Sequence, residues 1–177
     1  MKIKKIEVGY LKCNCYILVK DNKTLIIDPG DDFDKIDSAI EGELVGVIIT
    51  HYHFDHIGAM DSLVNKYNIK VYDINNLKEG NNTIDNFNFQ MIKTPGHKED
   101  LISILFENKL FCGDFIFEGS IGRIDLPGSN PKDMKNSLSK ITKLNKDTII
   151  YPGHGNETTL EKELPNLLMY EKILNKV

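Results

Sequence analysis

The 177-residue sequence has few cysteines, no long apolar run and no excess of basic residues. Its three cysteines are an odd number and do not indicate a framework of disulfide bonds. No run of about 18 consecutive apolar residues occurs, so we predict no membrane-spanning segment and no membrane partner. The net charge of −4 and the pI near 5.7 argue against a nucleic-acid-binding role.

The N-terminal segment MKIKKIEVGYLK is interrupted by lysines and a glutamate, unlike the apolar core of a secretory signal. We therefore expect a cytoplasmic protein. A length of 177 residues fits one domain, residues 1–177, that can bury a two-layer core. Cys13 and Cys15 would lie on one face of a strand, where they could be metal ligands or a redox pair; buried structural thiols are the favoured reading. Nothing in the sequence indicates an oligomeric state.

Short apolar runs bounded by glycine, proline or asparagine predict β-strands, whereas apolar spacings of three and four residues predict helices. Strands are expected at 3–8, 15–19, 24–28, 45–50, 69–72, 87–94, 101–107, 109–112 and 148–151. Helices are expected at 34–40, 57–67, 131–144 and 158–175, with 75–82 as a loop and 115–130 as an irregular segment. The buried stripe of the last helix is predicted to hold Leu160, Leu164, Leu167, Leu168 and Ile173, and Pro165 could kink or split this helix. This order fits two sheets between outer helices.

All five histidines lie in three short segments. His51, His53 and His56 occur in THYHFDH, His97 in TPGH and His154 in YPGH. Each segment follows a predicted strand, and a further strand leads through Gly113 into Asp114. If these strands share a sheet, the residues just past their ends gather along one edge, and the four strand exits converge on one cleft.

Seven side chains in these segments are candidate metal ligands. Imidazole and carboxylate suit zinc, iron or manganese, and the loop contains no cysteine for a thiolate-rich structural site. Seven ligands are too many for one tetrahedral ion and suit two divalent ions, with Zn²⁺ favoured and Fe or Mn possible. The candidates are His51, His53, Asp55, His56, His97, Asp114 and His154.

The chain resembles the metallo-β-lactamase-fold hydrolases, and most closely their short glyoxalase II-like branch. The resemblance runs from IDPG at 27–30 through THYHFDHIG, TPGH, GDFIFEGSIGRIDLPG and YPGHG. It implies an α/β fold, a four-layer αββα sandwich. It also implies that His51, His53 and His97 hold a first metal, that Asp55, His56 and His154 hold a second, and that Asp114 bridges them. Asp55 and Asp114 are the predicted catalytic residues, and Asp55 could also relay a proton.

This resemblance implies a dinuclear hydrolase that cleaves a small-molecule thioester, such as an S-lactoyl-thiol conjugate. Two neighbouring cations lower the pKa of a bridging water, and the resulting hydroxide attacks the carbonyl group. Alternatives are a mononuclear iron persulfide dioxygenase and a non-catalytic metal-binding domain. A diiron redox module, a β-lactamase and a nuclease fit the sequence less well.

The chain departs from the family pattern after His97, where the expected Thr-Pro-Gly-Ser type of turn is replaced by residues 98–101, KEDL. From its length we also expect no counterpart of the added helical domain that binds the glutathione part of the substrate in full-length glyoxalase II enzymes. Lys98, Arg123 and Lys132 are candidate contacts for a substrate carboxylate on charge alone. Arg123 and Asp125 are expected to hold the segment 119–128 in shape, and Asp28 to orient a ligand or cap a turn.

Overall fold

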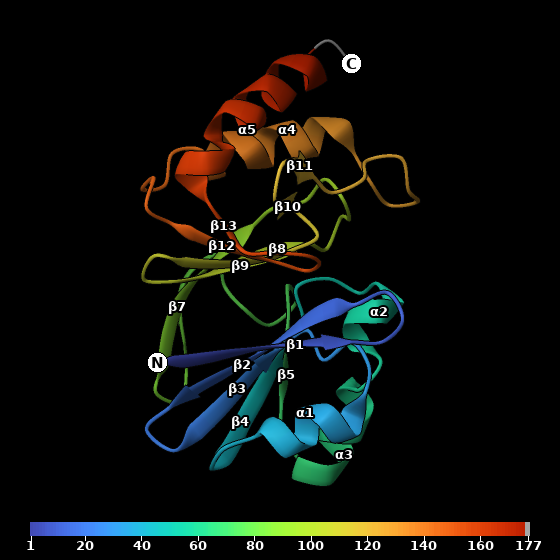
Figure 1. Ribbon diagram of the computed structural model, residues 1–177, viewed down its shortest axis with the longest axis vertical. Coiled ribbons are helices and arrows are strands. Elements are labelled where there is room, and N and C mark those ends of the chain that lie inside the picture. Colours follow the sequence, from blue (N-terminus) through green and yellow to red (C-terminus); the bar gives the residue numbers. More distant parts are fainter. Residues whose placement is uncertain (176–177) are drawn as a thin grey trace.

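The computed structural model describes residues 1–175, which fold as two stacked β-sheets with helices on both outer faces (Figure 1). One pair of helices, α1 (Phe33–Ala39) and α3 (Met60–Tyr67), covers the first sheet, and α4 (Pro131–Ile141) and α5 (Leu160–Leu174) cover the second. The predicted four-layer αββα sandwich is confirmed. Within residues 1–175, no helix is both long and apolar enough to cross a bilayer.

The first sheet has five strands in the order β1-β2-β3-β4-β5, of which β3, β4 and β5 are parallel. Its strands are β1 (Lys2–Val8), β2 (Cys13–Lys20), β3 (Lys23–Ile27), β4 (Glu43–Ile48) and β5 (Val71–Tyr72). Because β3 and β4 run in the same direction, Asp28 and Thr50, which follow them, lie at the same edge of the sheet.

The second sheet has six strands in the order β13-β12-β9-β8-β7-β6. Its strands are β6 (Gly80–Ile84), β7 (Phe87–Lys93), β8 (Ile102–Phe106), β9 (Lys109–Gly113), β12 (Ile149–Pro152) and β13 (Thr158–Thr159). Strand β9 is parallel to β12, and β7 runs in the same direction because β8 is antiparallel to both β7 and β9. The exits of β7, β9 and β12 therefore lie at one edge.

Apolar residues fill the space between the sheets and beneath each helix layer. Between the sheets, Phe111 stacks on Tyr151 with ring centroids 4.7 Å apart, and Tyr16 packs edge-on against both rings. Separate buried clusters lie under α1 and α3 and under α4 and α5. Burial of this apolar surface holds the four layers together.

Polar contacts join the two sheets near the strand exits. The Asn14 amide nitrogen Nδ2 donates to the carbonyl groups of Pro152 and Gly155, each at 3.0 Å, and the Tyr16 hydroxyl donates to Pro152 at 2.6 Å. The backbone N–H of Asn14 also donates to Gly153 at 2.7 Å. Strand β2 thus fixes the loop that carries His154.

The helix expected at 57–67 is divided in the structure. A short helix α2 (Phe54–Ile57) precedes α3, which begins at Met60. Between them, the backbone N–H groups of Gly58 and Ala59 donate to the carbonyl groups of Gly30 and Pro29, each at 2.9 Å. These bonds to a segment distant in sequence interrupt the helix, and a Cβ at Gly58 would lie 2.3 Å from the Gly30 carbonyl oxygen.

Two predicted loop segments contain short strands. The segment 75–82 was expected to be a loop, but β6 begins at Gly80 and pairs with β7. Within 115–130, β10 (Ile116–Phe117) pairs with β11 (Ser120–Ile121) in a separate two-stranded sheet. Two-residue strands carry too little side-chain alternation to be read from sequence.

The buried face of α5 differs from the predicted stripe. Leu160 and Leu167 are buried as expected, Leu164 is half-buried, and Leu168 and Ile173 are exposed. The buried face instead includes Glu163, whose carboxylate accepts hydrogen bonds from the Thr158 hydroxyl at 2.6 Å and the Gly119 backbone N–H at 2.9 Å. Apolarity alone therefore predicted only part of the buried face of the helix. Helix α5 continues through Pro165.

We predict that Glu163→Ala lowers the free energy of unfolding by about 1–3 kcal/mol, because it leaves the buried partners of the carboxylate without an acceptor. Urea denaturation followed by circular dichroism measures this change. Glu161→Ala, on an exposed position of the same helix, is the control and should change stability by less than about 0.5 kcal/mol. Equal effects of the two substitutions would contradict the structural role of Glu163.

Candidate metal centre

The structure brings all seven predicted ligand residues together at the strand exits. His51 and His53 lie in the segment between β4 and α2, and α2 itself carries Asp55 and His56. The remaining three follow strands of the second sheet: His97 comes after β7, Asp114 after β9 and His154 after β12. The site therefore lies across the edge shared by the two sheets.

The seven side chains form two groups. One group contains His51, His53, His97 and Asp114, and the other contains Asp55, His56 and His154. Within each group, one potential ligand atom from every residue lies within 4.8 Å of the others. In the first group, Nδ1 of His53 is 3.0 Å from Nε2 of His51 and 3.0 Å from Nε2 of His97.

Asp114 faces both groups with different carboxylate oxygens. Its Oδ2 is 3.6 Å from Nε2 of His97. Its Oδ1 is 3.3 Å from Nε2 of His56 and 3.6 Å from Nε2 of His154. Among residues 1–175, Asp114 Oδ1 and His56 Nε2 are both buried without a hydrogen-bond partner. Such unsatisfied buried atoms are costly in a protein, so this pair indicates a site built for a further group.

Four of the five imidazole rings make a hydrogen-bond contact through Nδ1, on the side away from the centre of the site. Nδ1 of His97 contacts the Arg123 carbonyl oxygen at 2.9 Å, and Nδ1 of His154 contacts the Leu11 carbonyl oxygen at 3.1 Å. Because a carbonyl only accepts, Nδ1 carries the proton in both rings and the Nε2 lone pair faces the centre. This is the arrangement that metal-binding histidines need.

Asp28 holds the other two rings. Its Oδ2 accepts from His56 Nδ1 at 2.9 Å and from the Thr50 hydroxyl at 2.6 Å, while Nδ1 of His51 contacts that hydroxyl oxygen at 3.1 Å. Asp28 Oδ1 also accepts the Thr50 backbone N–H at 2.8 Å. The carboxylate therefore combines the two roles expected for it, because it orients a ring and fixes the turn after β4. Its side chain connects one histidine of each group.

Glycines allow these side chains to approach closely. A Cβ at Gly153 would lie 2.2 Å from Asp114 Oδ1, and a Cβ at Gly113 would lie 2.4 Å from the Thr50 hydroxyl oxygen. Neither position can accept a larger residue without displacing the side chains around it. The glycines before Asp114 and His154 are thus a packing requirement of the site.

The charges of the site favour added positive charge. Burial lowers the pKa of His51 and His53 and keeps these rings neutral. Burial opposes ionisation of Asp55 and Asp114, yet contacts with His154 and His56 lower the pKa of both carboxyl groups. Without a metal ion, His56 and His154 of the second group bind protons more readily, because the neighbouring carboxylates raise their pKa against the effect of burial. Imidazole nitrogens around ionised carboxylates fit divalent cations.

The cysteines match the prediction of buried thiols, since Cys13, Cys15 and Cys112 are all free and buried. Cys13 Sγ lies 3.6 Å from Nδ1 of His56, behind the ring rather than beside its free nitrogen. Burial raises the pKa of the Cys13 thiol to about 11 despite the contact with His56. The protonated thiol is not the form that binds metals.

The unusual turn after His97 supports the histidine loop. Lys98 Nζ lies 3.1 Å from Asp100 Oδ2, and the same oxygen accepts the Tyr52 backbone N–H at 3.1 Å. The turn therefore ties His97 to the segment between His51 and His53. Lys98 is engaged by this contact.

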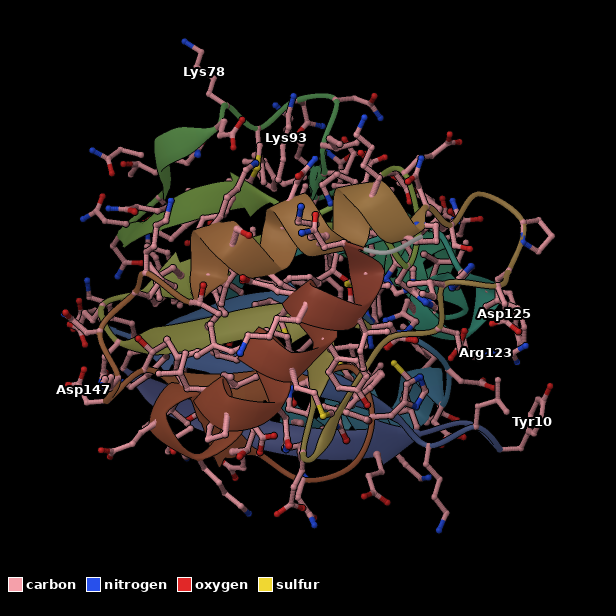
Figure 2. All side chains as sticks on the ribbon, turned by 90° about the horizontal axis from the view of Figure 1, so that it is seen from above. Tyr10, Lys78, Lys93, Arg123, Asp125 and Asp147 are labelled. Carbon is pink, nitrogen blue, oxygen red and sulfur yellow. The ribbon has the colours of Figure 1, made fainter. Side chains whose placement is uncertain are left out.

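A cleft of about 560 Å³ opens beside the two groups. Of the three proposed carboxylate contacts, only Arg123 lines it, whereas Lys132 lines a separate hollow at α4 and α5. Arg123 donates to both carboxylate oxygens of Asp125 at 2.9 Å, and the two side chains lie together at the edge of the molecule (Figure 2). The apolar walls of the cleft were not predicted from the sequence; they are formed by Leu11, Phe54, Phe117 and Leu126.

Comparison with known proteins identifies the family. The family model described as the metallo-beta-lactamase superfamily matches residues 8–79 and 70–154. The chain belongs to this superfamily. It is 31% identical to the probable metallo-hydrolase YqgX of Bacillus subtilis, over 92% of this chain and 94% of the relative. It is 29% identical to the hydroxyacylglutathione hydrolase GloC of Haemophilus influenzae, over 92% and 95% of the two chains. The resemblance to the short glyoxalase II-like branch is confirmed.

Solved structures support the same relationship. The crystal structure of the BLEG-1 B3 metallo-beta-lactamase superposes with a TM-score of 0.88 at 30% identity, covering 93% of this chain and 97% of that one. TTHA1623 in a di-iron-bound form superposes with a TM-score of 0.82 at 29% identity, covering 91% and 96%. Members of this superfamily bind divalent metals, and these two structures share the fold of the present chain.

We predict that Asp28→Asn weakens metal binding by about 10- to 100-fold, because the amide supports His56 and Thr50 less well than the carboxylate does. Competition with a chromophoric chelator measures the affinity and the number of ions bound. Asp34→Asn, an exposed change at the start of α1, is the matched control and should leave both unchanged. Unaltered metal binding in Asp28→Asn would refute the orienting role.

Proposed function

We propose that this chain is a dinuclear metal-dependent hydrolase that cleaves thioesters, with S-lactoyl-thiol conjugates as the first substrates to test. The observation that carries the proposal is the placement of Asp114, whose two oxygens face two separate histidine groups. A single closed structural site would not use a carboxylate in this way, and would not open into a cleft.

The proposed ligand assignment follows the two groups. His51 and His97 would bind the first ion through Nε2, and His53 would bind it through Nδ1, the nitrogen that faces the other two rings. Asp55, His56 and His154 would bind the second ion, with Asp114 between the two. Zn²⁺ is the favoured ion, because it accepts imidazole and carboxylate ligands; the same donors accept Fe or Mn.

Bound ions would supply a water of lowered pKa and positive charge for the carbonyl oxygen of the transition state. The residues of the chain determine where that chemistry occurs. Asp28 and the backbone carbonyls behind His97 and His154 fix the rings, so little reorganisation is needed during the reaction. The cleft leaves one side of the cluster open to the thioester.

Asp55 is the proposed proton carrier. Its Oδ2 lies 3.1 Å from Nε2 of His154, and contacts with His154 and His56 lower the pKa of its carboxyl group despite burial, which keeps the carboxylate ionised. In the proposed reaction, water adds to the thioester carbon and loses a proton to Asp55. The carbon–sulfur bond then breaks, and the proton goes to the departing sulfur, which gives a carboxylic acid and a thiol.

The relatives support hydrolysis but do not identify the substrate. GloC is named a hydroxyacylglutathione hydrolase, which favours a thioester, whereas BLEG-1 is named a metallo-beta-lactamase. The completeness of the second group, Asp55, His56 and His154, favours two ions over the mononuclear iron dioxygenase and over a non-catalytic domain.

We predict that the metal-loaded protein hydrolyses S-lactoylglutathione or another lactoyl thioester, and that His53→Ala and Asp114→Ala each lower kcat/KM by at least about a hundredfold. Thiol release with a chromogenic reagent measures turnover. Asp147→Ala is the matched control, since Asp147 is exposed on the side of the molecule opposite Arg123 and Asp125 (Figure 2).

Metal analysis and oxygen uptake complete this test. For the dinuclear hydrolase, metal analysis should find two ions per chain, and no oxygen should be consumed. One iron per chain with oxygen uptake on a persulfide would establish the dioxygenase instead. Turnover of a cephalosporin without turnover of any thioester would identify lactams, rather than thioesters, as the substrate class. Full thioesterase activity in both site variants would refute the assignment.

A further inference from the structure

The mouth of the metal cleft is apolar and exposed. Phe54 has 64% of its surface exposed although it lies directly beside Asp55 in α2, and Leu11, in the turn between β1 and β2, is 42% exposed. Both line the cleft, together with Phe117 and Leu126. Large apolar side chains exposed next to a reactive centre indicate a surface that binds an apolar group.

A second hollow continues this surface. It has a volume of about 200 Å³ and shares Leu11, Phe54 and Asp55 with the metal cleft. Val8 and Tyr10 also line it, and Tyr10 is 81% exposed. We call Leu11 and Phe54, the two apolar residues of this shared wall, the apolar ridge. A molecule that reacts at the metal cluster and extends over the apolar ridge would reach Tyr10.

The charges near the apolar ridge oppose binding of a carboxylate. Among residues 1–175, Arg123 is the one lysine or arginine lining either hollow, and its Nε and Nη2 both donate to Asp125 (Figure 2). Asp31 lines the second hollow and adds negative charge there. Lys98, which could otherwise attract an anion, is paired with Asp100. A glutathione-type thiol, which carries two carboxylates, would find no free lysine or arginine along this path.

We propose that this hydrolase selects thioesters whose thiol part is apolar and uncharged, and that the apolar ridge is the specificity-determining surface. This inference rests on the proposed thioesterase function and names its substrate class. Because a lactoyl group is small, the ridge and the second hollow are reached by the thiol part. Apolar contacts in such a pocket discriminate between substrates by about 10- to 200-fold.

The experiment compares three lactoyl thioesters that differ only in the thiol: 2-phenylethanethiol, N-acetylcysteamine and glutathione. The metal-loaded wild-type chain should show a kcat/KM for the phenylethanethiol ester at least about tenfold above those for the other two. Phe54→Ser should remove about tenfold of this advantage, mainly through KM, and lower kcat/KM for the N-acetylcysteamine ester by a smaller factor. Phe54→Leu, which keeps an apolar side chain, should retain most of it.

Leu168→Ser is the matched control, since it removes an exposed apolar side chain from α5 and should leave the order of the three substrates unchanged. A preference for the glutathione ester that is lost in Arg123→Gln would overturn the inference and leave the thioesterase function standing. A phenylethanethiol preference that persists in Phe54→Ser would also overturn the role of the ridge. No turnover of any of the three esters would overturn the proposed function, and the inference with it.

Discussion

The buried carboxylate of Asp28 is the contact on which the geometry of the site depends. It reaches His56 directly and His51 through the Thr50 hydroxyl, so one side chain sets the orientation of a ring in each group. A buried carboxylate is tolerated only where hydrogen bonds satisfy it, and Thr50 and His56 provide them. Structural stability and ring orientation therefore depend on the same few bonds.

The two sheets must also be held in a fixed relation, because each contributes part of the site. Asn14 and Tyr16 of β2 bind the loop that follows β12, and this loop carries His154. The turn after His97 likewise binds the backbone at Tyr52 through Asp100. Polar contacts between the sheets at this edge thus complement the apolar core, which fixes the distance between the layers but not their exact register.

The cleft joins a strongly polar cluster to an apolar mouth. Asp55 and its neighbour Phe54 illustrate this, because α2 directs the carboxylate to the cluster while the phenyl ring stays exposed. The polar cluster supports hydrolysis in general, and the apolar mouth determines which substrate groups can bind beside it. Arg123, engaged by Asp125, leaves little positive charge for an anionic substrate.

The sequence by itself determined the fold and the residues of the candidate site, because strand exits and clustered histidines are local patterns in the chain. It failed where the outcome depended on distant partners. Glu163 is buried, where its carboxylate accepts hydrogen bonds from Gly119 and Thr158, whereas Leu168 in the same helix is exposed. The family resemblance predicted the two groups of candidate ligands. Only the tertiary structure decided which atoms Asp28 anchors and that the cleft has an apolar mouth, because both depend on contacts between segments that lie far apart in the sequence.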